Sequence, residues 1–397
     1  MALRKGIFIV SAKRTPFGTY GGFLKDHSAT DLQEIANKAA LDAAKISPES
    51  IDSVFIGNVM QSSIDAAYIA RHSALRVGIP MHVPALTVNR LCGSGFQSIV
   101  SGAQELELGI GSMALCGGSE SMSQGPHMLF GARFGTKLGQ DLKLVDGLWA
   151  GLTDMHVKTP MGVTAENLAT KYGITREDTD AYALKTQSRW GEAQQSGKFN
   201  DEMITITIKS RKGPKEVSMD EHPRPGVTME QLAKLPPVFK KNGTVSAGNA
   251  SGVCDGAAAV IIATEEACQK HNLKPLARLV AYNSVGCDPN IMGIGPVPAI
   301  KNALAAANLN LADMDICDVN EAFAPQYLAV EKELGLDPEK TNVCGGAIAL
   351  GHPLGASGNR ITAHLTHQLR NRNLKYAVGA ACIGGGQGIA VILENAS

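Results

Sequence analysis

Three side chains with the chemistry of a covalent catalyst lie far apart in this sequence, each among small residues. Cys92 is followed by Gly-Ser-Gly, His352 stands between a glycine and a proline, and one residue separates Cys382 from three consecutive glycines. Small neighbours let the backbone of a ligand or a thioester approach closely. A thiol beside a histidine indicates covalent catalysis, and a second thiol in glycine-rich surroundings indicates a separate proton transfer.

Cys92 stands at the expected start of a helix that begins at Gly93 and continues through Val100. A helix N-terminus stabilises a thiolate, so we expect the pKa of Cys92 to lie below the free-thiol value of about 8.5. The other six cysteines are expected to be inert and buried, as is usual in an α/β protein. They are Cys116, Cys254, Cys268, Cys287, Cys317 and Cys344.

The bulk composition excludes several classes of protein. In 397 residues, Lys+Arg and Asp+Glu both total 37, so the net charge favours neither nucleic acid nor an anionic membrane as a partner. No apolar run reaches the roughly 18 residues that a membrane span needs. The eight cysteines contain no C-x-x-C pair, which argues against a zinc site. His364 and His367 are three apart but lack neighbouring ligands, so we expect surface residues there and no metal.

The N-terminal segment has two interpretations. Five basic residues and no acidic residue precede Asp26, a bias typical of a mitochondrial import segment. Residues 6–10 also have the pattern of a buried strand, in which case the segment is retained in the fold. The sequence leaves both open.

The chain nearly repeats itself, which predicts a duplicated α/β unit. In both copies an alanine-rich helical pattern leads into an apolar strand, at 34–58 and again at 298–320. A shift of 263 positions lays Ala43-Ala44 on Ala306-Ala307, Asp52 on Asp315, and Ser94-Gly95 on Ser357-Gly358. We expect Ser94 and Ser357 to pack between helices and not to act as nucleophiles.

Each copy closes with a continuous apolar strand that runs into glycines, at 113–118 and at 376–386. Such strands are buried on both faces, so helices must cover both sides of each sheet. The predicted fold is therefore α/β, with two duplicated halves in a five-layer α-β-α-β-α sandwich. The helices that open near Cys92 and His352 are expected to fill the middle layer.

Three regions follow from the repeat. Residues 1–118 form the N-terminal half, and 119–250 are a long loop insertion without a counterpart, of the kind that serves as a lid or binding loop. Residues 251–397 form the C-terminal half, and the strand at 251–265 is also able to complete the N-terminal sheet.

Cys92, the Asn320-Glu321-Ala322-Phe323 run, the Gly351-His352-Pro353 run and Cys382 occur in the order and spacing of one family. On these motifs the chain resembles the thiolases over essentially its whole length, and within them the mitochondrial type of fatty-acid β-oxidation. The resemblance implies the thiolase fold, a homo-oligomer (a dimer or a dimer of dimers) and a place in the mitochondrial matrix with an uncleaved import signal. It also implies no metal or organic cofactor, because coenzyme A is a substrate.

The resemblance assigns roles to five residues. Cys92 would become acylated, His352 would take its proton, and Cys382 would protonate the enolate of acetyl-CoA. Oxyanions would be held by His352 with a water on Asn320, and by the backbone N–H groups of Cys92 and Gly384. Glu321, beside Asn320, is expected to anchor its own loop.

Four further residues are assigned to coenzyme A by the resemblance. Arg224 matches an arginine against the nucleotide, where a planar guanidinium suits phosphate or adenine. Ser251 matches a serine on the pantetheine arm. Met161 and Phe323 would line the acyl end, with an ordinary place in the core as the alternative for both.

Three functions remain open. The first is thiolytic cleavage of 3-ketoacyl-CoA through an acyl-thioester on Cys92, with slow acyl-CoA hydrolysis if water replaces CoA. The second is the biosynthetic condensation of two acetyl-CoA molecules. The third is a thiolase-like protein that binds acyl-CoA without turnover, which the intact set of catalytic residues argues against.

Overall fold

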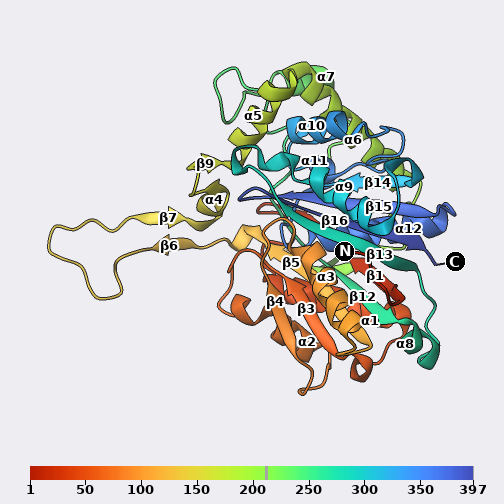
Figure 1. The fold of residues 1–397 in the computed structure, drawn as a ribbon. Helices are drawn as coiled ribbons and strands as arrows, with labels where there is room; N and C mark the ends of the chain where they lie inside the picture. The colour runs from red at the N-terminus through yellow and green to blue at the C-terminus, as the bar shows by residue number, and fades with distance from the viewer. Residues whose placement is uncertain (211–212, 397) are drawn as a thin grey trace.

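The structure is a computed structural model that describes residues 1–210 and 213–396. Ten of its strands form one sheet with two halves (Figure 1). The N-terminal half contains β1 (Ile7–Arg14), β12 (Cys254–Thr264), β5 (Met113–Ser121), β3 (Ser53–Gly57) and β4 (Ala85–Val88), with β2 (Gly18–Thr19) on β12. The C-terminal half contains β13 (Ala277–Gly286), β16 (Gln387–Asn395), β15 (Tyr376–Ile383) and β14 (Ile316–Val319).

The two halves join at one edge, which the sequence did not indicate. β1 pairs with β13 at Phe8↔Arg278 and Ile9↔Ala277 only, so the two sheets are continuous over a short stretch. β12 lies between β1 and β5, so the strand expected at 251–265 is part of the N-terminal sheet. β1 therefore has neighbours on both sides, and the basic N-terminal segment contains a central strand.

Helices cover both faces of each half, and the predicted α/β sandwich is confirmed. One outer layer is α1 (Ala29–Ala44), α2 (Ile69–Arg76) and α8 (Glu265–Lys270). The other outer layer is α9 (Pro296–Ala307) and α10 (Ala324–Leu334). The middle layer is α3 (Ser94–Leu108) and α12 (Ser357–Asn371), whose apolar residues pack against strands of both halves.

The duplication is visible in the elements themselves. The shift of 263 positions carries α3 onto α12 without a gap. The same shift also relates two sets of hydrogen bonds. Asp52 Oδ2 accepts the backbone N–H groups of Ser112 and Met113. Asp315 Oδ2 accepts those of Lys375 and Tyr376. Both carboxylates fix the entry of a central strand in the same way.

The middle helices cross at their first turns, where two glycines allow close contact. A Cβ atom on Gly95 would lie 2.7 Å from the backbone nitrogen of Asn359, and one on Gly358 would lie 2.1 Å from that of Phe96. The Ser-Gly steps therefore do pack between the helices. Cys92 and His352 lie on the loops that enter these two helices, so the crossing brings the loops to the same end of the middle layer.

The insertion contains a projecting hairpin and a group of helices that packs beside α10 (Figure 1). It contains β6 (His127–Leu129), β7 (Leu144–Asp146), α4 (Gly147–Gly151), β8 (Thr153–Asp154), β9 (Thr159–Pro160), α5 (Met161–Tyr172), α6 (Arg176–Gln195), β10 (Ile206–Ser210), β11 (Gly213–Val217) and α7 (Met229–Ala233). The hairpin of β6 and β7 projects far from the body of the molecule. Within the described residues, no helix is both long and apolar enough to cross a membrane.

His364 and His367 are buried, so their expected place on the surface is wrong. Both lie on α12, which is enclosed on all sides because it occupies the middle layer. His364 Nδ1 lies 2.8 Å from Glu202 Oε2, and Glu202 also pairs with buried Arg14. His367 Nε2 lies 2.9 Å from the carbonyl of Ala12. Their partners come from β1 and the insertion, which sequence spacing cannot show.

The His364–Glu202 pair predicts a loss of stability at alkaline pH. Burial alone would lower the pKa of His364, but the charge of Glu202 raises it to about 10. A histidine with a raised folded-state pKa stabilises fully below its unfolded value of about 6.5 and loses that contribution as the pH rises towards 10. We expect urea denaturation midpoints of the wild type to fall across this range.

His364→Gln removes the titrating group, so the variant should be less stable by about 3 kcal/mol near pH 6 and its midpoint should vary less between pH 6.5 and 10. Exposed His156→Gln serves as the control and should keep the wild-type dependence. The same pH profile in His364→Gln and the wild type would contradict the charged pair.

Candidate active site

Cys92 lies next to the end of β15, which carries Cys382, and next to the turn to β16, which carries Gly384. The backbone N–H of Gly384 donates to the Cys92 thiol, and the two cysteines are close enough for their charges to interact. A Cβ atom on Gly384 would lie 3.0 Å from Leu91 Cδ1 and 3.4 Å from Met161 Sδ, so a side chain there would fill the space beside Cys92. The structure thus brings together the nucleophile, the second cysteine and a backbone donor.

The expected low pKa of Cys92 is wrong for this structure. Burial raises the pKa of the Cys92 thiol to about 11, against the opposing effect of the N–H groups of Gly384 and of Cys92 itself. Helix α3 begins at Ser94, two residues beyond the thiol, and the loss of solvent outweighs its dipole. The thiol is therefore protonated at rest and needs a base.

His352 is a neutral base in the same region. Burial, and after it the nearby charge of Arg360, together lower the pKa of His352 to about 3. Its Nε2 lies 3.4 Å from Nδ2 of Asn320, which is fully buried. Asn320 Oδ1 is buried and has no hydrogen-bond partner within the described residues, so a bound water would satisfy it.

Glu321 anchors more than its own loop. It is fully buried, and its carboxylate accepts hydrogen bonds from Tyr182 and Thr186 of α6, from Asn342, and from the N–H of Ile348. Ile348 lies in α11 (Ala347–Leu350), which leads directly to His352. Glu321 therefore fixes the positions of Asn320 and His352 relative to each other and to the insertion.

Ser251 lies between the two catalytic loops. Its N–H donates to the carbonyl of Ala322, and the N–H of His352 donates to the carbonyl of Gly252. The return segment of the insertion is thus held by backbone bonds against both the Asn320 and the His352 loops. This contact places Ser251 in the wall of the same cavity as His352.

A largely apolar cavity of about 410 Å³ opens onto His352. Its lining includes Ser251, Met161 and Phe323, three of the four residues expected to contact coenzyme A. Trp149 and Phe239 add an aromatic wall, with ring centroids 6.3 Å apart and Phe239 edge-on to Phe323. Cavities of this size and character bind small organic ligands.

Arg224 is not part of this lining. Its guanidinium bonds the carbonyls of Glu221, His222 and Pro223 in its own turn, and its side chain is exposed. The adjacent His222 does line the cavity, so Arg224 stands beside its rim.

Two buried residues of the site were missed or misread in the sequence. Glu120 accepts hydrogen bonds from Asn58, from the N–H groups of Val59 and Met60, and from the N–H of Gly355 in the His352 loop. Ser357, expected only to pack, has its Oγ 2.5 Å from His352 Nδ1. A carboxylate at the end of an apolar strand was the one available indication for Glu120.

Among the six other cysteines, Cys287 is the exception to the expected burial. It is partly exposed, and its thiol lies 3.8 Å from the carbonyl of Met292. The remaining five are buried.

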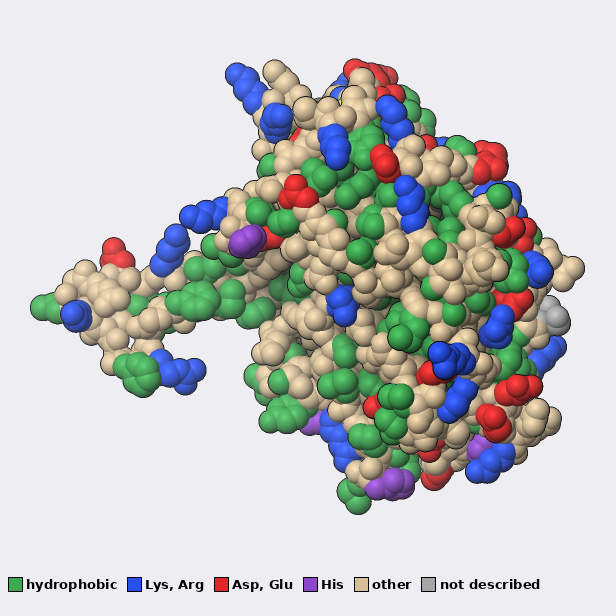
Figure 2. Space-filling view, viewed as in Figure 1, with side chains coloured by type: hydrophobic (Ala, Val, Ile, Leu, Met, Phe, Trp, Pro, Cys, Tyr) green, Lys and Arg blue, Asp and Glu red, His purple; other side chains and the backbone are tan. Residues whose placement is uncertain are grey.

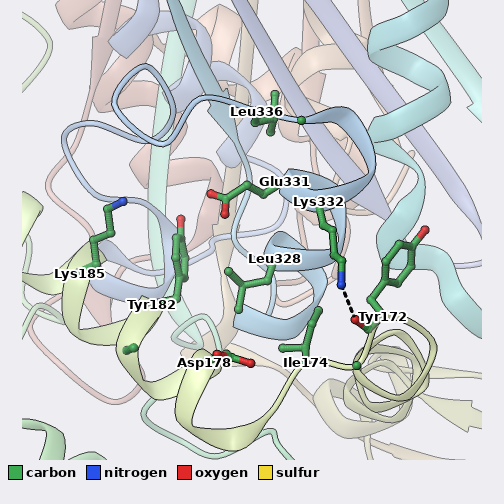
Figure 3. A pocket seen from close by; sticks show the side chains of 12 residues that line it. Tyr172, Ile174, Asp178, Tyr182, Lys185, Leu328, Glu331, Lys332 and Leu336 are labelled. Carbon is green, nitrogen blue, oxygen red and sulfur yellow. Dashed lines mark hydrogen bonds between the residues drawn. The ribbon is translucent and has the colours of Figure 1, made fainter.

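A second hollow of about 600 Å³ lies between α5, α6 and α10 (Figure 3). Its walls carry both signs of charge, from Lys185 and Lys332 on one hand and Asp178 and Glu331 on the other. Lys332 Nζ donates to the carbonyl of Tyr172 across it. It contains none of the catalytic candidates, so the cavity at His352 is the candidate active site.

Comparison with known proteins agrees with this geometry. The family model of the thiolase N-terminal domain matches residues 7–266, and that of the thiolase C-terminal domain matches residues 273–395. The chain belongs to the thiolase family. The N-terminal match ends just after β12, so it includes the insertion and the strand that returns from it.

Individual thiolases are similar over their full length. A mouse protein named mitochondrial 3-ketoacyl-CoA thiolase is 67% identical over 395 residues, covering 100% of both chains. The crystal structure of human mitochondrial 3-ketoacyl-CoA thiolase in complex with CoA has a TM-score of 0.97 at 65% identity, covering 100% of this chain and 99% of that one. An acetyl-CoA acetyltransferase of Bacillus anthracis has a TM-score of 0.95 at 43% identity, covering 99% of each.

Proposed function

We propose that this protein is an acetyl-CoA C-acyltransferase that cleaves 3-ketoacyl-CoA with CoA to give acyl-CoA and acetyl-CoA. The observation that carries the proposal is that Cys382, which lies near Cys92, packs with Met161 and Phe323, two side chains that line the cavity containing His352. Identity of 65–67% to thiolases named for 3-ketoacyl-CoA, against 43% for an acetyltransferase, favours the degradative reaction over the biosynthetic one.

The first half-reaction begins from the protonated thiol of Cys92 and the neutral imidazole of His352. His352 takes the proton of Cys92 as the sulfur attacks the ketone carbon, and the N–H groups at Cys92 and Gly384 stabilise one oxyanion. His352, with a water on Asn320, stabilises the enolate oxygen of the thioester. The bond between the α and β carbons breaks, and Cys382 gives its proton to the α-carbon of acetyl-CoA.

The second half-reaction regenerates the enzyme. The thiol of a second CoA attacks the acyl group on Cys92 and gives its proton to the Cys382 thiolate, while His352 returns its proton to the departing sulfur of Cys92. Water in place of CoA would give slow acyl-CoA hydrolysis. Side chains and CoA supply every proton and electron pair of this sequence, so we propose that it needs no metal or organic cofactor.

Coenzyme A binding follows from the cavity. Ser251, Met161 and Phe323 are proposed to contact the pantetheine and acyl parts, and Arg224 at the rim to meet the nucleotide. The human mitochondrial 3-ketoacyl-CoA thiolase, at 65% identity, has been crystallised with CoA, which supports a CoA site in this chain.

The decisive experiment is thiolysis of 3-ketoacyl-CoAs from four to sixteen carbons with free CoA, alongside acid release without CoA. We expect turnover well beyond four carbons and much slower hydrolysis. Turnover at four carbons only would favour acetoacetyl-CoA chemistry. No turnover at any length would leave an acyl-CoA-binding protein.

The mitochondrial matrix is the proposed location, supported by relatives named mitochondrial at 66–67% identity. Retention of the basic N-terminal segment is supported by β1, a central strand whose removal would leave β12 and β13 unpaired on that side.

A homo-oligomer is also proposed, with the projecting hairpin as a contact surface. The loop between β6 and β7 exposes Phe130, Phe134, Leu138 and Leu142 among basic side chains (Figure 2). Apolar groups gathered on an extended hairpin are typical of a protein interface. Light scattering should give a multiple of the 41.7 kDa chain, reduced by the double change Phe134→Ser and Leu138→Ser but not by Lys137→Ser. An unchanged mass in the double variant would exclude the hairpin.

A further inference from the structure

The two ring nitrogens of His352 have different partners. Nε2 lies 3.4 Å from Asn320 Nδ2, and Nδ1 lies 2.5 Å from Ser357 Oγ. Ser357 and His352 are 1% and 4% exposed, so solvent does not compete for these bonds. Whatever holds Nδ1 therefore decides which nitrogen carries the proton of the neutral ring.

The hydroxyl of Ser357 has one proton and two neighbours that are able to accept it. Its Oγ lies 3.0 Å from the carbonyl of Pro353, which accepts only. When the hydroxyl donates there, its lone pair accepts the Nδ1–H of His352. Nε2 then keeps its lone pair, which suits the amide donor of Asn320 and is the form that a base requires.

The N-terminal copy shows how this bond became available. Ser94 is the counterpart of Ser357, and its Oγ donates to the carbonyl of Leu91 and accepts the N–H of Arg90. The shift of 263 positions lays Arg90 on Pro353, and a proline has no N–H. Ser94 Oγ uses a lone pair to accept a backbone N–H. The corresponding lone pair of Ser357 Oγ has no such donor, so it is able to accept the Nδ1–H of His352.

We propose that Ser357 is a positioning residue that holds His352 in the tautomer with a free Nε2 lone pair, and that Pro353 makes this possible by withholding an N–H. This inference rests on the proposed role of His352 as the base for Cys92. The charged group facing His352 is Arg360, which pairs with Asp318 through Nη1 and is left unchanged by the variants below.

The test uses Ser357→Ala in the full chain, with steady-state thiolysis and the rate of Cys92 alkylation by iodoacetamide as readouts. Loss of the correct tautomer should lower kcat by about 10–100-fold with little change in KM, and should slow alkylation by a similar factor. Thr362→Val is the matched control, since Thr362 Oγ1 makes the same kind of bond to a carbonyl four residues earlier on α12 without touching His352. It should keep wild-type rates.

Pro353→Ala tests the role of the missing backbone N–H, because it restores that N–H and keeps the side chains of Ser357 and His352. The restored N–H should compete for the Ser357 lone pair and slow alkylation several-fold, whereas Ser357→Thr, which keeps the hydroxyl, should recover part of the rate. Alkylation needs no acyl-CoA, so it reports on His352 even if the proposed reaction is wrong. Wild-type alkylation rates in both Ser357→Ala and Pro353→Ala would overturn the proposal.

Discussion

Cys92→Ser is expected to abolish the acyl-enzyme and to lower kcat/KM for 3-ketoacyl-CoA thiolysis by about 10⁴-fold or more. A serine hydroxyl in this site has a far higher pKa than a thiol, and burial raises even the thiol to a pKa of about 11. His352 takes the proton of a hydroxyl far less readily than that of a thiol, because a hydroxyl is the much weaker acid. Attack on the ketone would therefore stop at its first step.

The measurement is intact mass after incubation with 3-ketoacyl-CoA in the absence of CoA, together with steady-state rates. The wild type should gain the mass of one acyl group, which peptide mapping should locate at Cys92. Cys268→Ser, at a buried cysteine on α8, should behave as the wild type. An acyl adduct in Cys92→Ser at the wild-type rate would exclude Cys92 as the nucleophile.

Cys382→Ser is expected to have a different defect. Cys382 is fully buried, and burial raises its pKa, as do the nearby Cys92 and Cys287. It is therefore a protonated acid, placed to give its proton to the enolate and to remove one from acetyl-CoA in reverse. A serine should still allow Cys92 to be acetylated slowly by acetyl-CoA, while exchange of the α-protons of acetyl-CoA with D₂O should fall by about 10²–10³-fold.

Comparing the two variants separates the roles of the cysteines. Acetylation is followed by intact mass, and exchange by the loss of the methyl proton signal. Cys116→Ser, at another fully buried cysteine, should leave both rates near the wild type. Equal loss of acetylation in Cys92→Ser and Cys382→Ser would contradict the separate assignments.

The sequence by itself determined the duplicated α/β halves and three members of the site. The register between α3 and α12 runs without a gap, so a constant shift revealed the repeat before any contact was known. Cys92, His352 and Cys382 were found because each lies in a glycine-rich motif whose purpose is close approach of a ligand. Such local motifs are recognisable from the sequence alone.

Only the tertiary structure decided the electrostatics and the supporting residues. Whether Cys92 is a thiol or a thiolate depends on how much solvent the opposite half excludes, and here burial outweighs the helix dipole. Glu120, Glu321 and His364 each bond groups from segments far apart in the chain, so spacing gave no indication of their partners. Ser357 and Ser94 occupy matching positions, yet one holds the imidazole and the other only backbone, because a proline replaces an N–H donor four residues earlier. Such differences arise from three-dimensional contacts between residues, and no single segment of the chain contains them.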